Sequence, residues 1–178
     1  MTRTISTALA LAGLLLLVSW PNISASQSFG IGIGQSYLKQ TLNNERLPPL
    51  VTQDVSAQLS APGAFAEYRV QFHQDELWRQ QLKMGVNVHP TSTKTVRPFY
   101  SLDLFGKTRY SGAGILFSRQ RDGGKQFDLS ALYRESGYGF SGKLTMQNPY
   151  LGGGVGLDYD KYGNSVIWGP SVELGVRW

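Results

Sequence analysis

Apolar and polar side chains alternate with a period of two residues over most of this chain, and the pattern strongly restricts its fold. Between residues 64 and 73, Ala66 and Tyr68 alternate with Glu67 and Arg69. Successive side chains of an extended strand point to opposite faces, so this period predicts strands with one apolar and one polar face. Short stretches rich in Gly, Pro, Asn and Asp separate the segments, as turns require. The sequence therefore predicts an all-β antiparallel meander in a single domain.

Alternation of this kind fits two architectures. In a soluble sandwich or barrel the apolar face forms the core, whereas in a transmembrane β-barrel it meets lipid and the polar face lines the lumen. We expect the membrane form, because the polar faces mix both charges with glycine and because aromatic residues lie near segment ends, where interfacial girdles form. These aromatic residues are Phe72, Trp78, Tyr110, Phe117, Phe127, Tyr133, Tyr138, Tyr150 and Tyr159.

The first 25 residues have the features of a secretory signal peptide. Arg3 precedes an unbroken apolar run, Ala8 to Val18, that is too short to span a bilayer comfortably. We predict cleavage after Ala25, with cleavage one residue later as an alternative, so that residues 26–178 form the barrel. An uncleaved anchor helix is the other interpretation, although Pro21 interrupts the run where an anchor would continue.

Composition removes several classes of protein. The chain has no Cys, which excludes a disulfide scaffold, a Cys-ligated metal and a lipidated lipoprotein. It has 17 Lys and Arg, including Arg3 of the predicted signal peptide, against 12 Asp and Glu. This mild excess contains no block of like charges, so we predict no nucleic-acid partner.

The last residues alternate and end on an aromatic side chain. Val172, Leu174 and Val176 are apolar at every second position, and Trp178 is the final residue. This segment resembles the terminal β-signal of Gram-negative outer-membrane β-barrel proteins. The resemblance implies a bacterial outer-membrane location. It also implies the barrel assembly machinery as a partner during biogenesis, and outer-membrane lipid and lipopolysaccharide as the surroundings.

The number of strands follows from the segments and from parity. Nine segments are clear: 28–40, 64–73, 77–89, 95–105, 108–119, 125–135, 138–147, 150–160 and 165–178. Bacterial single-chain barrels have even strand numbers, so we predict a tenth strand over 51–59, and eight strands if two weaker segments are loops. In the ten-strand arrangement, the stretch Thr41–Pro49 is the longest connection and lies outside the cell.

The charged residues of the polar faces are the candidate lumen lining. Arg69, Lys83, Arg97 and Arg134 are long enough to fill a narrow interior, and they make one side of it basic. We expect them to pair with acidic side chains and plug the lumen, as small barrels usually do; a narrow path for small anionic solutes is the alternative. The full predicted lining is Glu67, Arg69, Lys83, Arg97, Asp103, Asp128, Arg134, Lys143, Asp158 and Glu173.

Glycine is abundant, with 21 residues in the chain against a usual share of ~7%. Two spaced sets, Gly30 to Gly34 and Gly152 to Gly156, open no helix, so they lack the geometry of a phosphate-binding loop. We expect them on the inward faces of the first strand and of the strand over 150–160, where a missing side chain leaves lumen volume or lets a bulky neighbour cross.

The candidates for catalysis are few. His73 and His89 are the two histidines, and each lies at a predicted strand end beside turn residues. His89 is followed by Pro90-Thr91-Ser92 and lacks the His-x-Ser-Asn pattern of outer-membrane lipid A deacylases. We therefore predict no catalytic residue, no metal and no cofactor. Three functions stay open: a structural or interaction barrel first, a small-solute channel second, and a lipid-modifying enzyme third.

Overall fold

The computed structural model describes residues 28–91, 93–148 and 151–177, so the predicted signal peptide and Trp178 lie outside the described residues. Within these ranges no helix is long and apolar enough to cross a bilayer. The strands are β1(Ser28–Leu42), β2(Glu45–Ser60), β3(Ala64–His73), β4(Glu76–Val86), β5(Val88–Thr91), β6(Lys94–Phe105), β7(Thr108–Arg121), β8(Lys125–Arg134), β9(Gly137–Gln147), β10(Leu151–Tyr162) and β11(Ser165–Arg177), and one short 3-10 turn, η2(Asp122–Gly124), joins β7 to β8.

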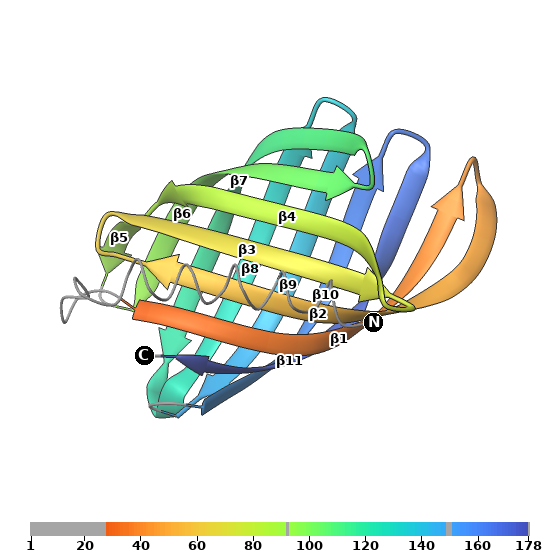
Figure 1. Ribbon diagram of the computed structural model, residues 1–178. Coiled ribbons are helices and arrows are strands. Elements are labelled where there is room, and N and C mark those ends of the chain that lie inside the picture. Colours follow the sequence, from red (N-terminus) through yellow and green to blue (C-terminus); the bar gives the residue numbers. More distant parts are fainter. Residues whose placement is uncertain (1–27, 92, 149–150, 178) are drawn as a thin grey trace.

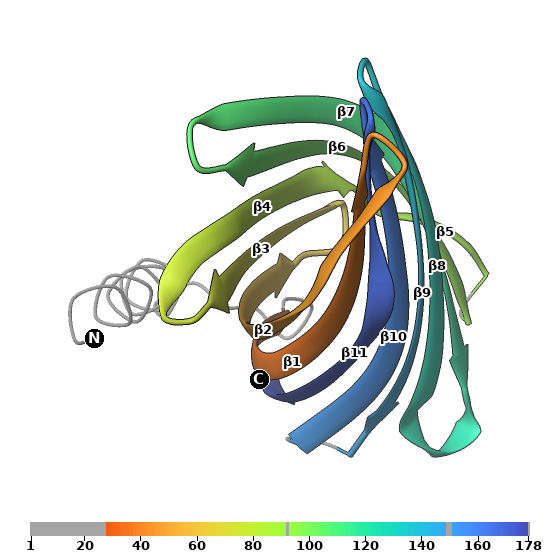
Figure 2. The same cartoon turned by 90° about the vertical axis from the view of Figure 1, so that its right-hand side faces the viewer.

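Ten of these strands close into an antiparallel barrel. The order is β4-β3-β2-β1-β11-β10-β9-β8-β7-β6, and β4 pairs with β6 to complete the circle. In Figure 1, β2, β3 and β4 cross in front of β8, β9 and β10 at a steep angle, as strands on opposite walls of a tilted barrel do. Figure 2 shows β1, β11, β10 and β9 side by side in one wall. The predicted ten-stranded meander is confirmed.

The predicted segment 77–89 is divided in the structure. Asn87 separates β4 from the short β5, and both strands pair with β6. The Asn87 backbone NH donates to the Gly63 carbonyl at 3.1 Å, and its side-chain amide donates to the Ala64 carbonyl at 3.0 Å. Asn87 therefore ties the end of β4 to the β2–β3 turn instead of continuing the ladder.

The predicted long connection Thr41–Pro49 is wrong. Those residues form the far ends of β1 and β2, joined by a two-residue turn at Asn43 and Asn44, both with positive φ. Asn tolerates this left-handed conformation, and two such residues form a tight hairpin turn. The β1–β2 register shifts between Leu38 and Gln40, opposite Pro48 and Pro49, and the β2–β3 ladder begins only at Gln53. The prolines thus lie where no ladder hydrogen bond is lost.

The two ends of the barrel differ. At one end, which we call the tight-turn end, residues 43–44, 74–75, 106–107, 135–136 and 163–164 connect the described strands. At the other, the terminal end, β1 begins and β11 ends. In single-chain outer-membrane barrels both chain termini face the periplasm, which orients the terminal end inward.

The direction of the apolar face distinguishes a transmembrane β-barrel from a soluble sandwich or barrel, which alternation alone could not do. Ile33, Ile115 and Val155 are more than half exposed, while their sequence neighbours line the interior. Such a surface needs lipid around it, because a soluble protein rarely leaves a continuous apolar belt in water. The exposed belt includes Val51, Leu59, Met84, Val86, Tyr100, Phe127, Leu129, Tyr133, Tyr138, Phe140, Leu144, Met146, Leu151, Leu157, Val172, Leu174 and Val176.

Candidate functional site: the barrel interior

Two arginines and two aspartates form a closed square of ion pairs across the lumen near the tight-turn end. Arg79 of β4 lies 3.2 Å from Asp103 of β6 and 3.0 Å from Asp160 of β10. Arg134 of β8 lies 2.8 Å from each of the same two carboxylates. We call these four residues the charge quartet. Its members come from the paired strands β4 and β6 and from β8 and β10, so their side chains bridge the interior between the β4–β6 wall and β10.

Further hydrogen bonds complete the quartet. The Tyr162 hydroxyl accepts from Arg79 at 2.6 Å and donates to Asp103 at 3.2 Å, while the Gln81 amide donates to Asp103 at 2.6 Å. The side chains of Asp103 and Arg134 are 0% and 1% exposed. Burial of charge is costly unless each charge is paired. Every charge of the quartet has an oppositely charged partner, although Arg79 Nε and Arg134 Nη1 have no hydrogen-bond partner.

An aromatic and aliphatic cluster lies beside the quartet, toward the tight-turn end. The Phe105 ring packs edge-on against Trp78 and Tyr162, with centroids 5.4 and 5.0 Å away, and Tyr110 lies 4.7 Å from Tyr162. Leu38, Leu50 and Ile167 complete this group, which we call the aromatic cap.

Trp78 and Tyr110 were predicted in an interfacial girdle, and that prediction is wrong. The β3–β4 register shifts so that Gln71 pairs with Arg79 and Phe72 with Leu77, which leaves Trp78 as the bulged residue. A bulge changes the face to which a side chain points, and Trp78 accordingly packs in the interior. Tyr110 shares the inward face of β7 with Gly112. Tyr133 and Tyr138 do lie exposed on the outer surface, and Tyr150 lies outside the described residues.

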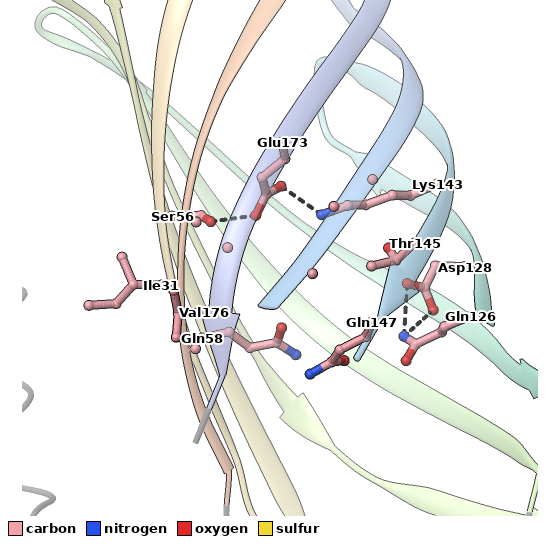
Figure 3. A pocket seen from close by; sticks show the side chains of 16 residues that line it. Ile31, Ser56, Gln58, Gln126, Asp128, Lys143, Thr145, Gln147, Glu173 and Val176 are labelled. Atoms are coloured by element: carbon pink, nitrogen blue, oxygen red, sulfur yellow. Dashed lines mark hydrogen bonds and ion pairs between the residues drawn. The ribbon is translucent and has the colours of Figure 1, made fainter. Parts of the chain in front are cut away.

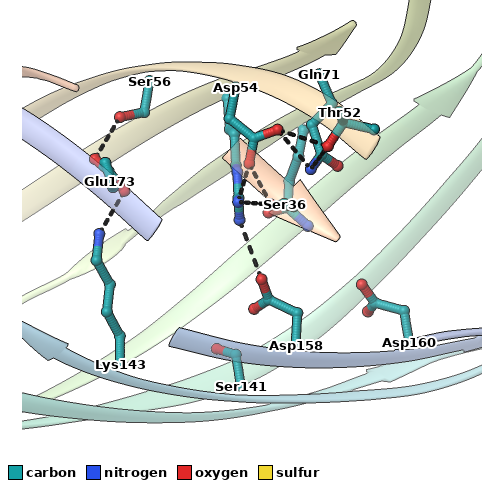
Figure 4. Close-up of polar contacts among 12 residues, drawn as sticks. Ser36, Thr52, Asp54, Ser56, Gln71, Ser141, Lys143, Asp158, Asp160 and Glu173 are labelled. Carbon is teal, nitrogen blue, oxygen red and sulfur yellow. Dashed lines mark hydrogen bonds and ion pairs between the residues drawn. The ribbon is translucent and has the colours of Figure 1, made fainter. Parts of the chain in front are cut away.

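A second polar cluster surrounds Asp54 of β2, nearer the middle of the lumen (Figure 4). Arg69 forms an ion pair with Asp54 and reaches across to Asp158 of β10 at 3.4 Å. Asp54 also accepts hydrogen bonds from Ser36 at 2.6 Å, from Thr52 at 2.9 Å and from Gln71 at 3.1 Å. Arg69 therefore links the β2–β3 wall to the β10 wall.

A third ion pair lies closer to the terminal end. The Lys143 ammonium of β9 is 2.6 Å from the Glu173 carboxylate of β11, which also accepts a hydrogen bond from Ser56 at 2.9 Å. A Cβ on Gly32 would meet the Glu173 carboxylate at 2.1 Å. The missing side chain thus lets Glu173 lie across β1, one of the two roles expected for the inward glycines. Lys143 and Glu173 remain 39% and 29% exposed.

The opposite wall is apolar and basic. Phe65, Phe99 and Leu132 form a buried cluster with Leu116. The Lys83 ammonium lies 5.8 Å from the Phe99 ring and 3.8 Å from Glu67, while the Arg97 guanidinium lies 5.5 Å from the Phe65 ring. Cations over ring faces are favourable where water is scarce.

Two cavities, each of about 120 Å³, occupy the terminal half of the lumen. The outer one is lined by Gly30, Gly32, Gly152 and Gly154 together with amides and the Lys143–Glu173 pair (Figure 3). The inner one extends to Arg69 and Asp158, and the two share Ser56, Gln58, Gln126, Asp128, Lys143 and Glu173. Most of this space therefore lies on the terminal side of the quartet, and a third, smaller cavity of about 30 Å³ borders Arg79, Arg134 and Asp160 themselves.

The structure places all ten predicted lining residues at the interior. Nine of them line a cavity, and Asp103 is fully buried in the quartet. Asp128 differs from expectation, because it accepts hydrogen bonds from Gln126 at 2.9 Å while its cross-strand neighbour Lys143 pairs with Glu173.

Sequence reasoning missed three partners, Asp54, Arg79 and Asp160. Asp54 and Asp160 stood on polar faces of predicted strands, so inward alternation could have found them. Arg79 follows the bulged Trp78, and the bulge itself has no signal in the sequence.

The two candidate catalytic histidines belong to different strands, β3 and β5. The His73 Nδ1 lies 2.9 Å from the Val51 carbonyl oxygen at the tight-turn end, and the side chain of His89 lies outside the described residues. Among the described residues, no group of three or more His, Asp or Glu side chains is arranged to hold a metal ion.

Comparison with known proteins adds a likeness of fold. No protein-family model and no curated protein matches the sequence. A structure of the KdgM porin superposes with a TM-score of 0.52 at 12% identity, covering 83% of this chain and 98% of that chain. The COG4313 outer membrane channel from Pseudomonas putida F1 gives 0.54 at 9% identity, covering 88% and 96%. With its apolar belt outside and its charges inside, the chain is a small ten-stranded β-barrel of the bacterial outer membrane.

Proposed function

We propose that this barrel does not conduct solutes and has a structural or interaction role in the outer membrane. The observation that carries the proposal is the charge quartet. Asp103 of β6 and Arg134 of β8 are buried almost completely, although both are charged and point into the lumen. Side chains that exclude water at one level leave no continuous aqueous path through that level, and small barrels usually have filled interiors.

The aromatic cap supports the same conclusion. Its side chains come from β1, β2, β4, β6, β7, β10 and β11, so it extends over most of the circumference beside the quartet. A solute crossing the barrel must displace both layers. The quartet satisfies its own charges internally, and this leaves little to attract an ion from solution.

A second candidate function is a narrow channel. The two cavities in series support it, as does the fold shared with the KdgM porin and the COG4313 outer membrane channel. The inner cavity is lined by four basic residues, Arg69, Lys83, Arg97 and Lys143, and by four acidic ones, Glu67, Asp128, Asp158 and Glu173. This balance gives no support to a preference for anionic solutes.

Conductance in planar bilayers separates the two functions. We expect the folded wild-type barrel to give no stable open channel. A variant with Arg79, Asp103, Arg134 and Asp160 all changed to Ser, plus Trp78→Ala and Phe105→Ala, should conduct, because the quartet is removed and two large rings of the cap are truncated without a change in net charge. That variant also demonstrates that the barrel inserts in the assay. A wild-type conductance as large as that of the variant contradicts the closed barrel and favours the channel.

A further inference from the structure

Four basic side chains gather on the outer surface of the barrel at its terminal end. They are Lys94 of β6, Arg119 and Arg121 of β7, and Lys125 of β8, and all four are exposed. We call them the basic rim. Ile115 and Phe117 precede Arg119 at every second position of β7, and Phe127 and Leu129 follow Lys125 in the same way on β8. Because Ile115, Phe127 and Leu129 are exposed on the lipid side, the rim faces outward.

The strand register brings like charges together in the rim. Lys94 is the direct cross-strand partner of Arg119, and Arg121 is the direct partner of Lys125. Like charges placed opposite each other destabilise a strand pair. No acidic side chain of the described residues forms an ion pair with any of the four, although Asp122 lies in the turn between Arg121 and Lys125.

The rim contrasts with the charges of the interior. Arg69, Arg79, Arg134, Lys83 and Lys143 each have a carboxylate within ion-pair distance. The protein therefore neutralises its buried cations with its own aspartates and glutamates, but leaves a group of outward cations to be neutralised by something else.

The position of the rim indicates which molecule neutralises its charge. Phe127 lies beside the rim as the cross-strand partner of Arg119, and toward the bilayer centre the outer faces of the same strands carry Val96, Phe117 and Leu129, followed by Ile115. A headgroup phosphate at the rim would thus have its acyl chains against an apolar surface. The terminal end faces the periplasm in barrels of this type, so the lipid within reach is a glycerophospholipid of the periplasmic leaflet.

We propose that the basic rim binds an anionic glycerophospholipid of the periplasmic leaflet. Arg119 and Arg121 can hold phosphate oxygens in a bidentate manner, and Lys94 and Lys125 add positive charge on either side. Bound phosphate converts two repulsive cross-strand pairs into shared contacts with one anion. The site stands independently of whether the lumen conducts.

The test compares lipid retention by three forms of the whole folded barrel. The rim variant carries Lys94→Gln, Arg119→Gln, Arg121→Gln and Lys125→Gln. The matched control carries four exposed substitutions away from the rim, Lys39→Gln, Arg46→Gln, Lys107→Gln and Arg109→Gln, with the same change in net charge. Each protein is equilibrated with equal amounts of phosphatidylcholine and phosphatidylglycerol, and the retained lipid is identified by native mass spectrometry.

We expect the wild type and the control to retain phosphatidylglycerol preferentially, and the rim variant to lose the preference by about tenfold or more, because each basic residue near an anionic surface adds to the attraction. Equal preference in the rim variant and the wild type overturns the proposal. So does an equal loss in the control, which would indicate a response to net charge alone. A wild type without any preference would point to a periplasmic polymer or protein and would also overturn it.

Thermal unfolding gives a second readout. In phosphatidylcholine alone, the rim variant should be at least as stable as the wild type, because two like-charge pairs are gone. With phosphatidylglycerol present, the order should reverse. A rim variant that unfolds at a lower temperature in both lipids indicates a structural role for the four residues and contradicts lipid binding.

Discussion

The tight-turn half and the terminal half of the lumen contain the same kinds of charged residue but differ in burial. In the charge quartet the side chains are between 0% and 13% exposed, whereas Lys143 and Glu173 are 39% and 29% exposed beside a cavity. Removing a buried partner leaves an uncompensated charge, while an exposed pair contributes little. The comparison indicates that stability is concentrated in the first half and accessible space in the second.

The largest effect is expected from Asp103→Asn. This change leaves Arg79 and Arg134 buried with one carboxylate, Asp160, between them, and should lower the free energy of unfolding by roughly 3–5 kcal/mol. Urea unfolding of the barrel in detergent micelles measures it, with the wild type as reference. A loss below that of a surface substitution would mean that the quartet is hydrated and that the two halves do not differ.

A smaller effect is expected from adding a methyl group in each half. A Cβ on Gly112 would lie 2.2 Å from the Tyr133 carbonyl oxygen, so Gly112→Ala forces a backbone shift and should cost about 1–3 kcal/mol. On Gly152 the nearest atom is 3.4 Å away, so Gly152→Ala should change stability by less than about 0.5 kcal/mol. Equal losses of unfolding free energy for the two variants in the same assay would contradict the conclusion that one half of the lumen is crowded and the other open.

The two halves of the lumen should also differ in how easily a reagent in solution reaches them. The chain has no Cys, so a single introduced thiol reports one position. Gln126→Cys places the thiol in the terminal cavities, and Ser101→Cys places it at a fully buried position. We expect a charged, membrane-impermeant thiol reagent to modify the first at least about tenfold faster, since reactivity follows access of the thiolate. Comparable rates in the folded barrel would show an aqueous path past Ser101.

The smallest effect is expected from Lys143→Met. The substitution removes the exposed Lys143–Glu173 pair and should lower the free energy of unfolding by less than about 1 kcal/mol, with the loss decreasing further in high salt. Urea unfolding at low and high salt measures both values. A salt-independent loss as large as that of Asp103→Asn would show that this pair is buried in solution.

Much of the fold could be predicted from residue patterns, because strand alternation and turn chemistry are local. The ten strands and most of their bounds follow from this. Local reasoning was wrong at Thr41–Pro49, where two consecutive asparagines form a tight turn and the prolines fall at a register shift. It was also wrong at Trp78, where a bulge turned an expected girdle residue into the interior. Bulges and register shifts depend on the neighbouring strand, which a single segment does not contain.

In the candidate site, too, local features could be predicted and contacts between distant strands could not. The ten predicted lining residues lie at the interior because inward alternation is a property of each strand by itself. Which of them pair with which partners could not be predicted, since Arg69 meets Asp158 across 89 positions of sequence and Glu173 meets Ser56 across 117.

The amino-acid sequence alone determined an all-β meander with two-faced strands and predicted its place in the outer membrane. Tertiary structure decided that the apolar faces point outward, that four charges bridge one level of the lumen, that space remains at the terminal end, and that four unpaired cations share one outer surface. The physical reason is that alternation defines two faces for each strand, whereas closure of the barrel determines which faces, and which charges, come into contact.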